Sequence, residues 1–60
     1  MARYLTTGAL AKELGVSAGA ILKWTRDGLI TPAFTTPGGH HRWLLDDVRR
    51  ELRERRQRDE

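Results

Sequence analysis

Residues 5–28 read LTTGALAKELGVSAGAILKWTRDG and contain the same helix-start signal twice. Thr6 and Ser17 are hydroxyl residues whose side-chain oxygen can accept from free backbone amides two or three residues later, as a helix N-cap does. Between them, Gly15 supplies the left-handed residue at which a first helix can end. The stretch therefore predicts two short helices joined by a turn of three residues.

Apolar residues support both predicted helix starts. Leu5 and Leu10 form a hydrophobic staple around the first cap, and Val16 and Ile21 form one around the second. Two helices separated by so short a turn have the spacing of a helix-turn-helix unit. The predicted helices span residues 7–14 and 18–27.

Length and composition limit the kinds of function that this chain can have. Sixty residues give one small domain, and 38% hydrophobic with 32% charged residues are typical of a globular chain. The absence of cysteine excludes disulfides and cysteine-ligated metal sites, and so short a chain barely walls off a catalytic pocket. No apolar stretch approaches the length of a membrane span or a signal peptide, so a cytoplasmic location is expected. The net charge of +3 favours a polyanionic partner.

A hairpin is predicted after the second helix. Two β-tolerant runs, residues 34–36 and 40–43, flank the tip Pro37-Gly38-Gly39, where proline and glycine exclude a helix. Strands this short need support from the helices. The predicted wing covers residues 30–43, with Trp43, Leu29 and Phe34 facing inward.

A third helix is predicted from Leu45, Val48 and Leu52, which share one helical face. Its arginine-rich end also carries acidic residues, which favours a solvated helix end over a basic tail. The helix is expected over residues 45–57, with i, i+4 ion pairs Asp46–Arg50, Glu51–Arg55 and Glu54–Arg58.

Several strings resemble one known family along nearly the whole chain, the winged helix-turn-helix domain of the MerR and excisionase superfamily. Gly38-Gly39-His40-His41-Arg42-Trp43 is similar to that family's Gly-Gly-His-Arg-Arg-Tyr wing and is the most specific of them. His41, Trp43 and Leu22 depart from the usual arginine, tyrosine and arginine. The implied fold class is mainly α with a small β-hairpin wing. The other matching strings are Tyr4-Leu5-Thr6 (opening strand and cap), residues 11–17 (junction), residues 24–30 (exit from the second helix) and Asp47-Val48 after the wing.

The resemblance implies a function on double-stranded DNA. MerR regulators continue into a long dimerisation helix and an effector-binding part, whereas this sequence ends at Glu60. It therefore looks most like a small mycobacteriophage excisionase, a recombination directionality factor. Such a protein binds repeated sites cooperatively with neighbouring copies of itself, bends DNA and directs a tyrosine integrase toward prophage excision. The alternatives are a small BldC-like transcriptional regulator and a basic protein-interaction module that engages an acidic partner.

The second helix is expected to present its N-terminal and outward residues to base edges in the major groove. Ser17 could serve only as a cap, and Gly19 either permits close approach to DNA or is simply tolerated near a helix end. The candidate recognition-helix residues are Ser17, Ala18, Gly19, Lys23 and Arg26.

The wing and the start of the first helix are the other candidate DNA contacts. The glycines of the wing let its backbone come close to a phosphate, and the free amides at the helix start can hold one. One of His40 and His41 is expected to pack inward, bonded to backbone, and two histidines on opposite strand faces do not make a metal site. Trp24 and Trp43 are expected in the core rather than stacked on bases. Catalytic residues, cofactors, metals and a small-molecule effector are not expected. The candidates are Thr36, Gly38, Gly39, His40, His41 and Arg42 in the wing, and Thr6 and Thr7 at the first helix.

Overall fold

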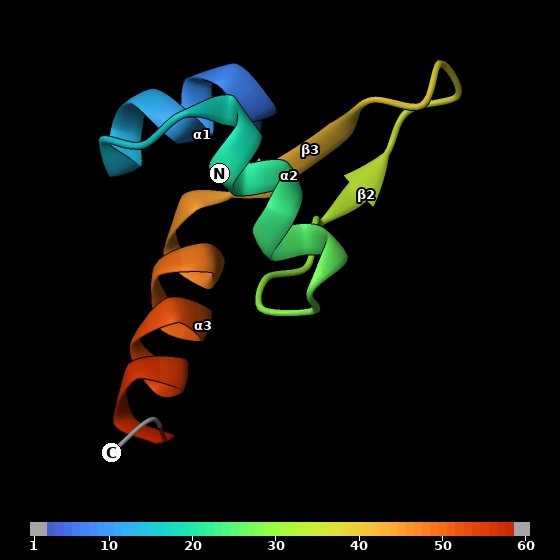
Figure 1. Cartoon of the computed structure of the whole chain (residues 1–60). Helices are drawn as coiled ribbons and strands as arrows, with labels where there is room; N and C mark the ends of the chain where they lie inside the picture. The colour runs from blue at the N-terminus through green and yellow to red at the C-terminus, as the bar shows by residue number, and fades with distance from the viewer. Residues whose placement is uncertain (1–2, 59–60) are drawn as a thin grey trace.

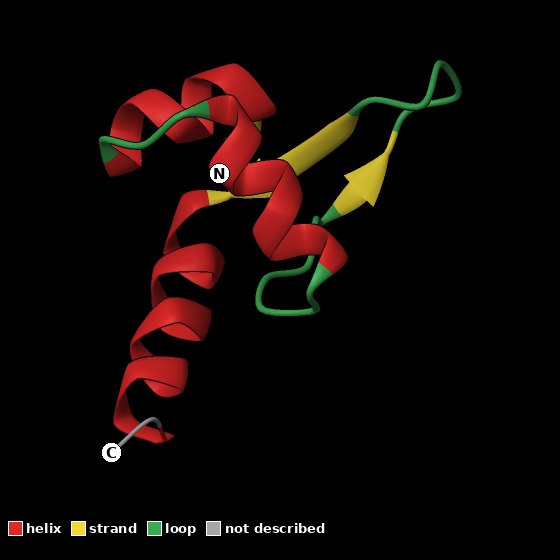
Figure 2. Cartoon of the chain, viewed as in Figure 1, coloured by secondary structure: helices red, strands yellow, loops and turns green. Residues whose placement is uncertain are grey.

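The computed structural model describes residues 3–58, and side chains through residue 54. Three helices are combined with a small three-stranded sheet (Figures 1 and 2), as the predicted winged helix-turn-helix class requires. The hairpin projects from the body on one side, and the third helix extends away from it on the other (Figure 1). In chain order the elements are β1 (Tyr4–Thr6), α1 (Thr7–Leu14), α2 (Ala18–Arg26), β2 (Phe34–Thr35), β3 (His41–Leu44) and α3 (Leu45–Arg58).

Both predicted N-caps are confirmed. Thr6 Oγ1 accepts from the Ala9 amide at 3.1 Å, and Ser17 Oγ accepts from the Ala20 amide at the same distance. Gly15 ends α1 with φ of 72°, a left-handed conformation that a β-carbon disfavours. The direction of α2 relative to α1 is therefore set by residues within the turn itself, Gly15 and the cap Ser17.

The far ends of α2 and α3 differ by one residue from the predicted ranges. α2 ends at Arg26 rather than residue 27, because Asp27 is its C-cap and the following Gly28 turns left-handed with φ of 79°. α3 continues to Arg58 rather than residue 57. Helix ends are the least sharply encoded part of such a pattern.

The hairpin strands pair antiparallel with each other and with β1, in the order β1-β3-β2. Leu5 lies opposite Trp43 across β1 and β3, which places both on the face that packs against the helices. The wing is therefore supported by a third strand as well as by the helices.

The expectation that Phe34 faces inward is wrong. Phe34 lies opposite Arg42, and strand residues alternate between faces, so it shares the face opposite to Trp43. Its side chain is 46% exposed and meets the ring of Tyr4 edge to face, with centroids 5.0 Å apart. Trp43 itself is fully buried, as predicted.

The core is small and draws on every helix. Trp24 and Leu29 are partly buried rather than fully enclosed, and Trp24 packs against the core as expected. Trp43 lies with side chains from all three helices, so the wing strand and the helices share one apolar cluster. The buried residues are Leu10, Ala11, Ile21, Ile30, Trp43 and Val48.

Two contacts of α3 differ from the predicted ion pairs. Arg50 lies 3.5 Å from Asp47, one turn back, rather than pairing with Asp46. The Glu51 carboxylate accepts from the backbone amide of Thr31 at 3.1 Å, which ties α3 to the loop before the wing. The expected pairs involving Arg55 and Arg58 lie outside the described side chains.

Candidate nucleic-acid interface

One face of α2 is open to solvent along its whole length. Ile21 is fully buried and Trp24 is half-buried, so the residues on the opposite side of this helix point outward. Four of the five predicted recognition residues lie on this face, and Ser17 caps its start. The exposed residues are Ala18, Gly19, Leu22, Lys23 and Arg26.

Gly19 has room for a larger side chain within the protein itself. A β-carbon added there would meet its nearest neighbour, Ser17 Oγ, only at 3.8 Å, and the backbone is helical. Packing inside the chain therefore does not require glycine at this position. A close neighbour outside the chain is a physical reason for it, since glycine lowers helix stability relative to alanine.

The basic side chains of α2 are held only loosely. Lys23 Nζ lies 3.9 Å from Asp27 Oδ2, and both side chains are at least half exposed. An ion pair of this kind contributes little stability in water. Lys23 can therefore leave the Asp27 carboxylate and bind another anion, such as a phosphate group. Arg26 is exposed one turn after Leu22 on the same face.

The wing tip is a tight loop whose geometry is fixed by hydrogen bonds around Thr36. The Thr36 amide donates to the His40 carbonyl and the Gly39 amide donates to the Thr36 carbonyl, both at 2.8 Å. Thr36 Oγ1 also accepts from the His40 amide at 3.2 Å. This is the pattern of a three-residue hairpin loop closed by a left-handed residue, here Gly39 with φ of 88°.

The two wing histidines differ in environment. His41 is half-buried, its Nδ1 is hydrogen-bonded to Thr35 Oγ1 at 2.9 Å, and its ring meets Trp43 edge to face at 5.7 Å. His40 is exposed. One packed histidine is thus found, but its partner is a side-chain hydroxyl rather than the backbone, because the cross-strand residue Thr35 lies on the same face.

The wing and the start of α1 enclose an open depression of about 330 Å³. Arg42, half-buried, directs one guanidinium nitrogen to the His41 carbonyl at 3.1 Å. The first amides of α1 have no partner within the helix and carry its positive dipole end. Residues from two distant segments, the wing and the start of α1, thus line the same depression. The lining residues are Thr6, Thr7, Gly8, His40, His41 and Arg42.

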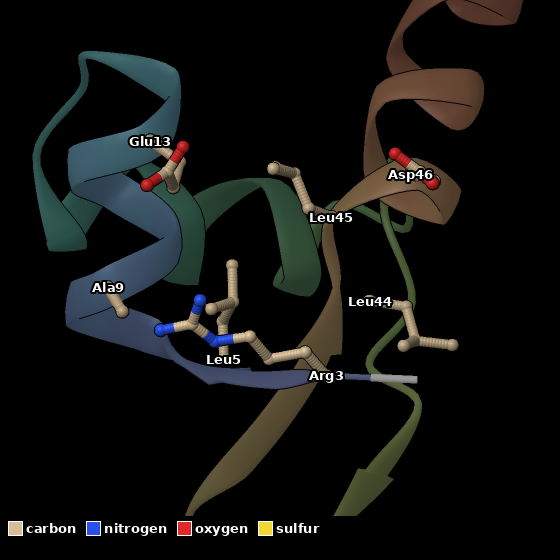
Figure 3. A pocket seen from close by; sticks show the side chains of 7 residues that line it. All are labelled: Arg3, Leu5, Ala9, Glu13, Leu44, Leu45 and Asp46. Carbon is tan, nitrogen blue, oxygen red and sulfur yellow. The ribbon is translucent and has the colours of Figure 1, made fainter. Parts of the chain in front are cut away.

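A second hollow, of about 430 Å³, lies between α1, β1 and the beginning of α3 (Figure 3). Its charged residues are Arg3, Glu13 and Asp46, so two carboxylates oppose one guanidinium and the hollow does not attract a phosphate. The remaining lining residues are Leu5, Ala9, Leu44 and Leu45.

Metal-ion clusters and membrane-spanning helices are both absent from residues 3–58. No three histidine or acidic side chains in this range lie close enough together to hold a metal ion. None of the helices there has both the length and the apolar character that a bilayer crossing requires.

Comparison with known proteins agrees with this structure, in which an exposed second helix follows a tight turn and a β-hairpin comes after it. The model of the helix-turn-helix domain family matches residues 4–56. The chain belongs to this helix-turn-helix family. It is a family of small DNA-binding domains that includes excisionase-like proteins, and such domains are typically non-enzymatic. No curated protein and no solved structure matches the chain.

In this helix-turn-helix domain, the hairpin tip projects beyond the body that contains the first turns of α1 and α2, and α3 runs away from all three (Figure 1). Two residues on these surfaces, Gly8 and Leu22, are not among the candidates predicted from the sequence. Gly8 lines the depression, and its signal was a glycine directly after a capped helix start. Leu22 is 51% exposed, and its signal was an apolar residue out of phase with Ile21 and Trp24.

Proposed function

We propose that this helix-turn-helix domain places the exposed face of α2 in the major groove of duplex DNA while its wing contacts the adjoining backbone. DNA binding itself is indicated by the family. The residues proposed for α2 are Ser17, Ala18, Gly19, Lys23 and Arg26. Those proposed for the backbone contacts are Thr36, Gly38, Gly39, His40, His41 and Arg42 in the wing, and Thr6 and Thr7 at α1.

The depression between the wing and α1 carries this proposal. It gathers a guanidinium, two imidazoles and the positive end of a helix around one open space, and a phosphate oxygen is stabilised by each of these groups. A phosphate held there would fix the orientation of the domain on the duplex without reading sequence. The base-reading role then falls to α2, whose exposed face carries both small and basic residues.

We further propose that several copies act together on repeated sites, bend the DNA and direct a tyrosine integrase toward excision. A single domain of this size covers roughly 600–1,000 Å² of interface and offers few base-reading side chains, so one copy discriminates weakly between sequences. Adjacent copies would supply the missing selectivity. Excisionase-like proteins occur in the same family, which favours this role.

The alternative function is that of a small transcriptional regulator of the BldC type, in which the same DNA contacts control a promoter. The two roles differ in what the bound protein does to recombination. An integrase-dependent reaction between attachment sites, run with and without the protein, separates them. The excision role predicts that product forms faster with the protein present.

Arg42→Ala and Arg53→Ala provide matched variants for that assay. Each removes one arginine, but Arg53 is exposed on α3 and does not line the depression. Arg42→Ala should reduce the stimulation at a given protein concentration, and Arg53→Ala should keep it. DNA binding without any effect on recombination would favour the transcriptional role, and binding to an acidic protein but not to duplex would favour a protein-interaction module.

A further inference from the structure

Leu22 is a large apolar side chain left exposed on the helix proposed to read DNA. Three large hydrophobic residues are more than 40% exposed in the described chain, namely Tyr4, Leu22 and Phe34. Tyr4 and Phe34 pack edge to face on the outer face of the sheet. Leu22 instead stands on the exposed face of α2, one turn after Ala18 and one turn before Arg26.

The exposed face of α2 has two chemically different sides. At 100° per residue, Ala18 and Leu22 lie toward one side of Gly19 and Lys23 lies toward the other. Ala18 and Leu22 carry no charge and no hydrogen-bonding side chain, whereas Lys23 and, one turn after Leu22, Arg26 make the rest of the exposed face basic. A major groove offers matching features, since base edges carry many polar groups and one apolar group, the C5 methyl of thymine.

We propose that Leu22 contacts a thymine C5 methyl and makes this domain prefer an A·T pair at one position of its site. The inference rests on the proposed function, because it requires α2 to lie in the major groove. Ala18 carries only a methyl group and Gly19 carries no side chain, so the first turn of the helix can approach the base edges closely. Leu22, one turn later, then reaches the methyl group, while Lys23 and Arg26 remain for phosphates or guanine.

The size of the effect follows from the area that one methyl group buries. Burying one such group is worth about a fourfold change in affinity. A contact of that size would be a preference rather than an absolute requirement.

The experiment removes the methyl from the DNA and the apolar side chain from the protein. A duplex is first selected from a random pool by the wild-type chain, and each thymine in it is then replaced singly by uracil, which lacks only the C5 methyl. Wild type and Leu22→Ala are compared on every duplex. Circular dichroism and thermal melting establish that Leu22→Ala folds, as expected for a side chain 51% exposed.

The proposal predicts one thymine whose replacement weakens wild-type binding about fourfold and leaves Leu22→Ala unaffected. Wild-type affinity that is insensitive to uracil at every position would overturn it. A uracil effect that persists in Leu22→Ala would also overturn it, since the loss then comes from another side chain or from DNA shape. In both cases binding to the selected duplex would leave the DNA-binding proposal standing. If no duplex is enriched and none is bound at low salt, both proposals fail.

Discussion

The indole nitrogen of Trp43 donates a hydrogen bond to Thr7 Oγ1 at 3.1 Å, across 36 positions of the chain. Trp43 belongs to the central strand and is fully buried, whereas Thr7 is the first residue of α1. The bond satisfies the one polar atom of a buried tryptophan and joins the wing to α1. These two elements form the two sides of the depression proposed to hold a phosphate.

Thr7→Val should destabilise the fold by about 1–3 kcal/mol, because the isosteric side chain leaves a buried N–H without an acceptor. Urea denaturation measures the change. Thr7→Ser keeps the hydroxyl and should lose much less. In a Trp43→Phe background the Thr7→Val penalty should largely disappear, and an equal penalty in both backgrounds would show that the bond does not stabilise the fold.

Gly19→Ala should separate folding from DNA binding. The added methyl has space within the chain and should stabilise the helix by up to about 1 kcal/mol. The same methyl lies on the face proposed to approach base edges, so affinity for duplex should fall. Thermal melting and a binding titration measure the two effects, and a variant that is both more stable and at least as tight in binding would contradict the placement of Gly19 at the DNA.

The wing-tip glycines should respond differently to alanine. Gly38 has ordinary φ, and an added β-carbon would meet His40 at 3.5 Å, an ordinary contact, so Gly38→Ala should fold normally but weaken DNA binding by blocking backbone approach. Gly39 has φ of 88°, so Gly39→Ala should also lower the free energy of unfolding, by about 1 kcal/mol. Unchanged binding by a folded Gly38→Ala would argue against a wing contact at that residue.

Asp27→Asn should tighten binding to duplex by about two- to fivefold at low salt, because it removes a carboxylate near the proposed interface and releases Lys23. Lys23→Ala and Arg26→Ala should weaken binding and alter sequence preference, whereas Arg42→Ala should weaken all duplexes alike. Competition between several duplexes distinguishes the two patterns. Unchanged or weaker binding by Asp27→Asn would contradict the placement of this carboxylate near the DNA.

Local signals in the sequence determine much of this fold. Thr6, Gly15 and Ser17 act through atoms only a few residues away, so the caps and the turn were readable from the chain. The burial of Trp43 and Ile21 followed from hydrophobic periodicity for the same reason.

The register between the strands is harder to predict from the sequence. Phe34 is exposed because it pairs with Arg42 rather than lying on the Trp43 face, and nothing local to residues 34–36 fixes that pairing. The contact between Glu51 and Thr31, and that between Trp43 and Thr7, likewise depend on how distant elements pack. The depression is visible only once the wing and α1 are assembled.

Salt dependence of binding to duplex DNA tests the central proposal most directly. If α2, the wing and the start of α1 together neutralise four or more phosphates, the slope of log affinity against log salt concentration should be about −3.6 or steeper. Arg42→Ala should make that slope shallower by about 0.9, and Arg53→Ala should not change it. An affinity that does not vary with salt, or the same slope in Arg42→Ala as in wild type, would contradict the proposed interface.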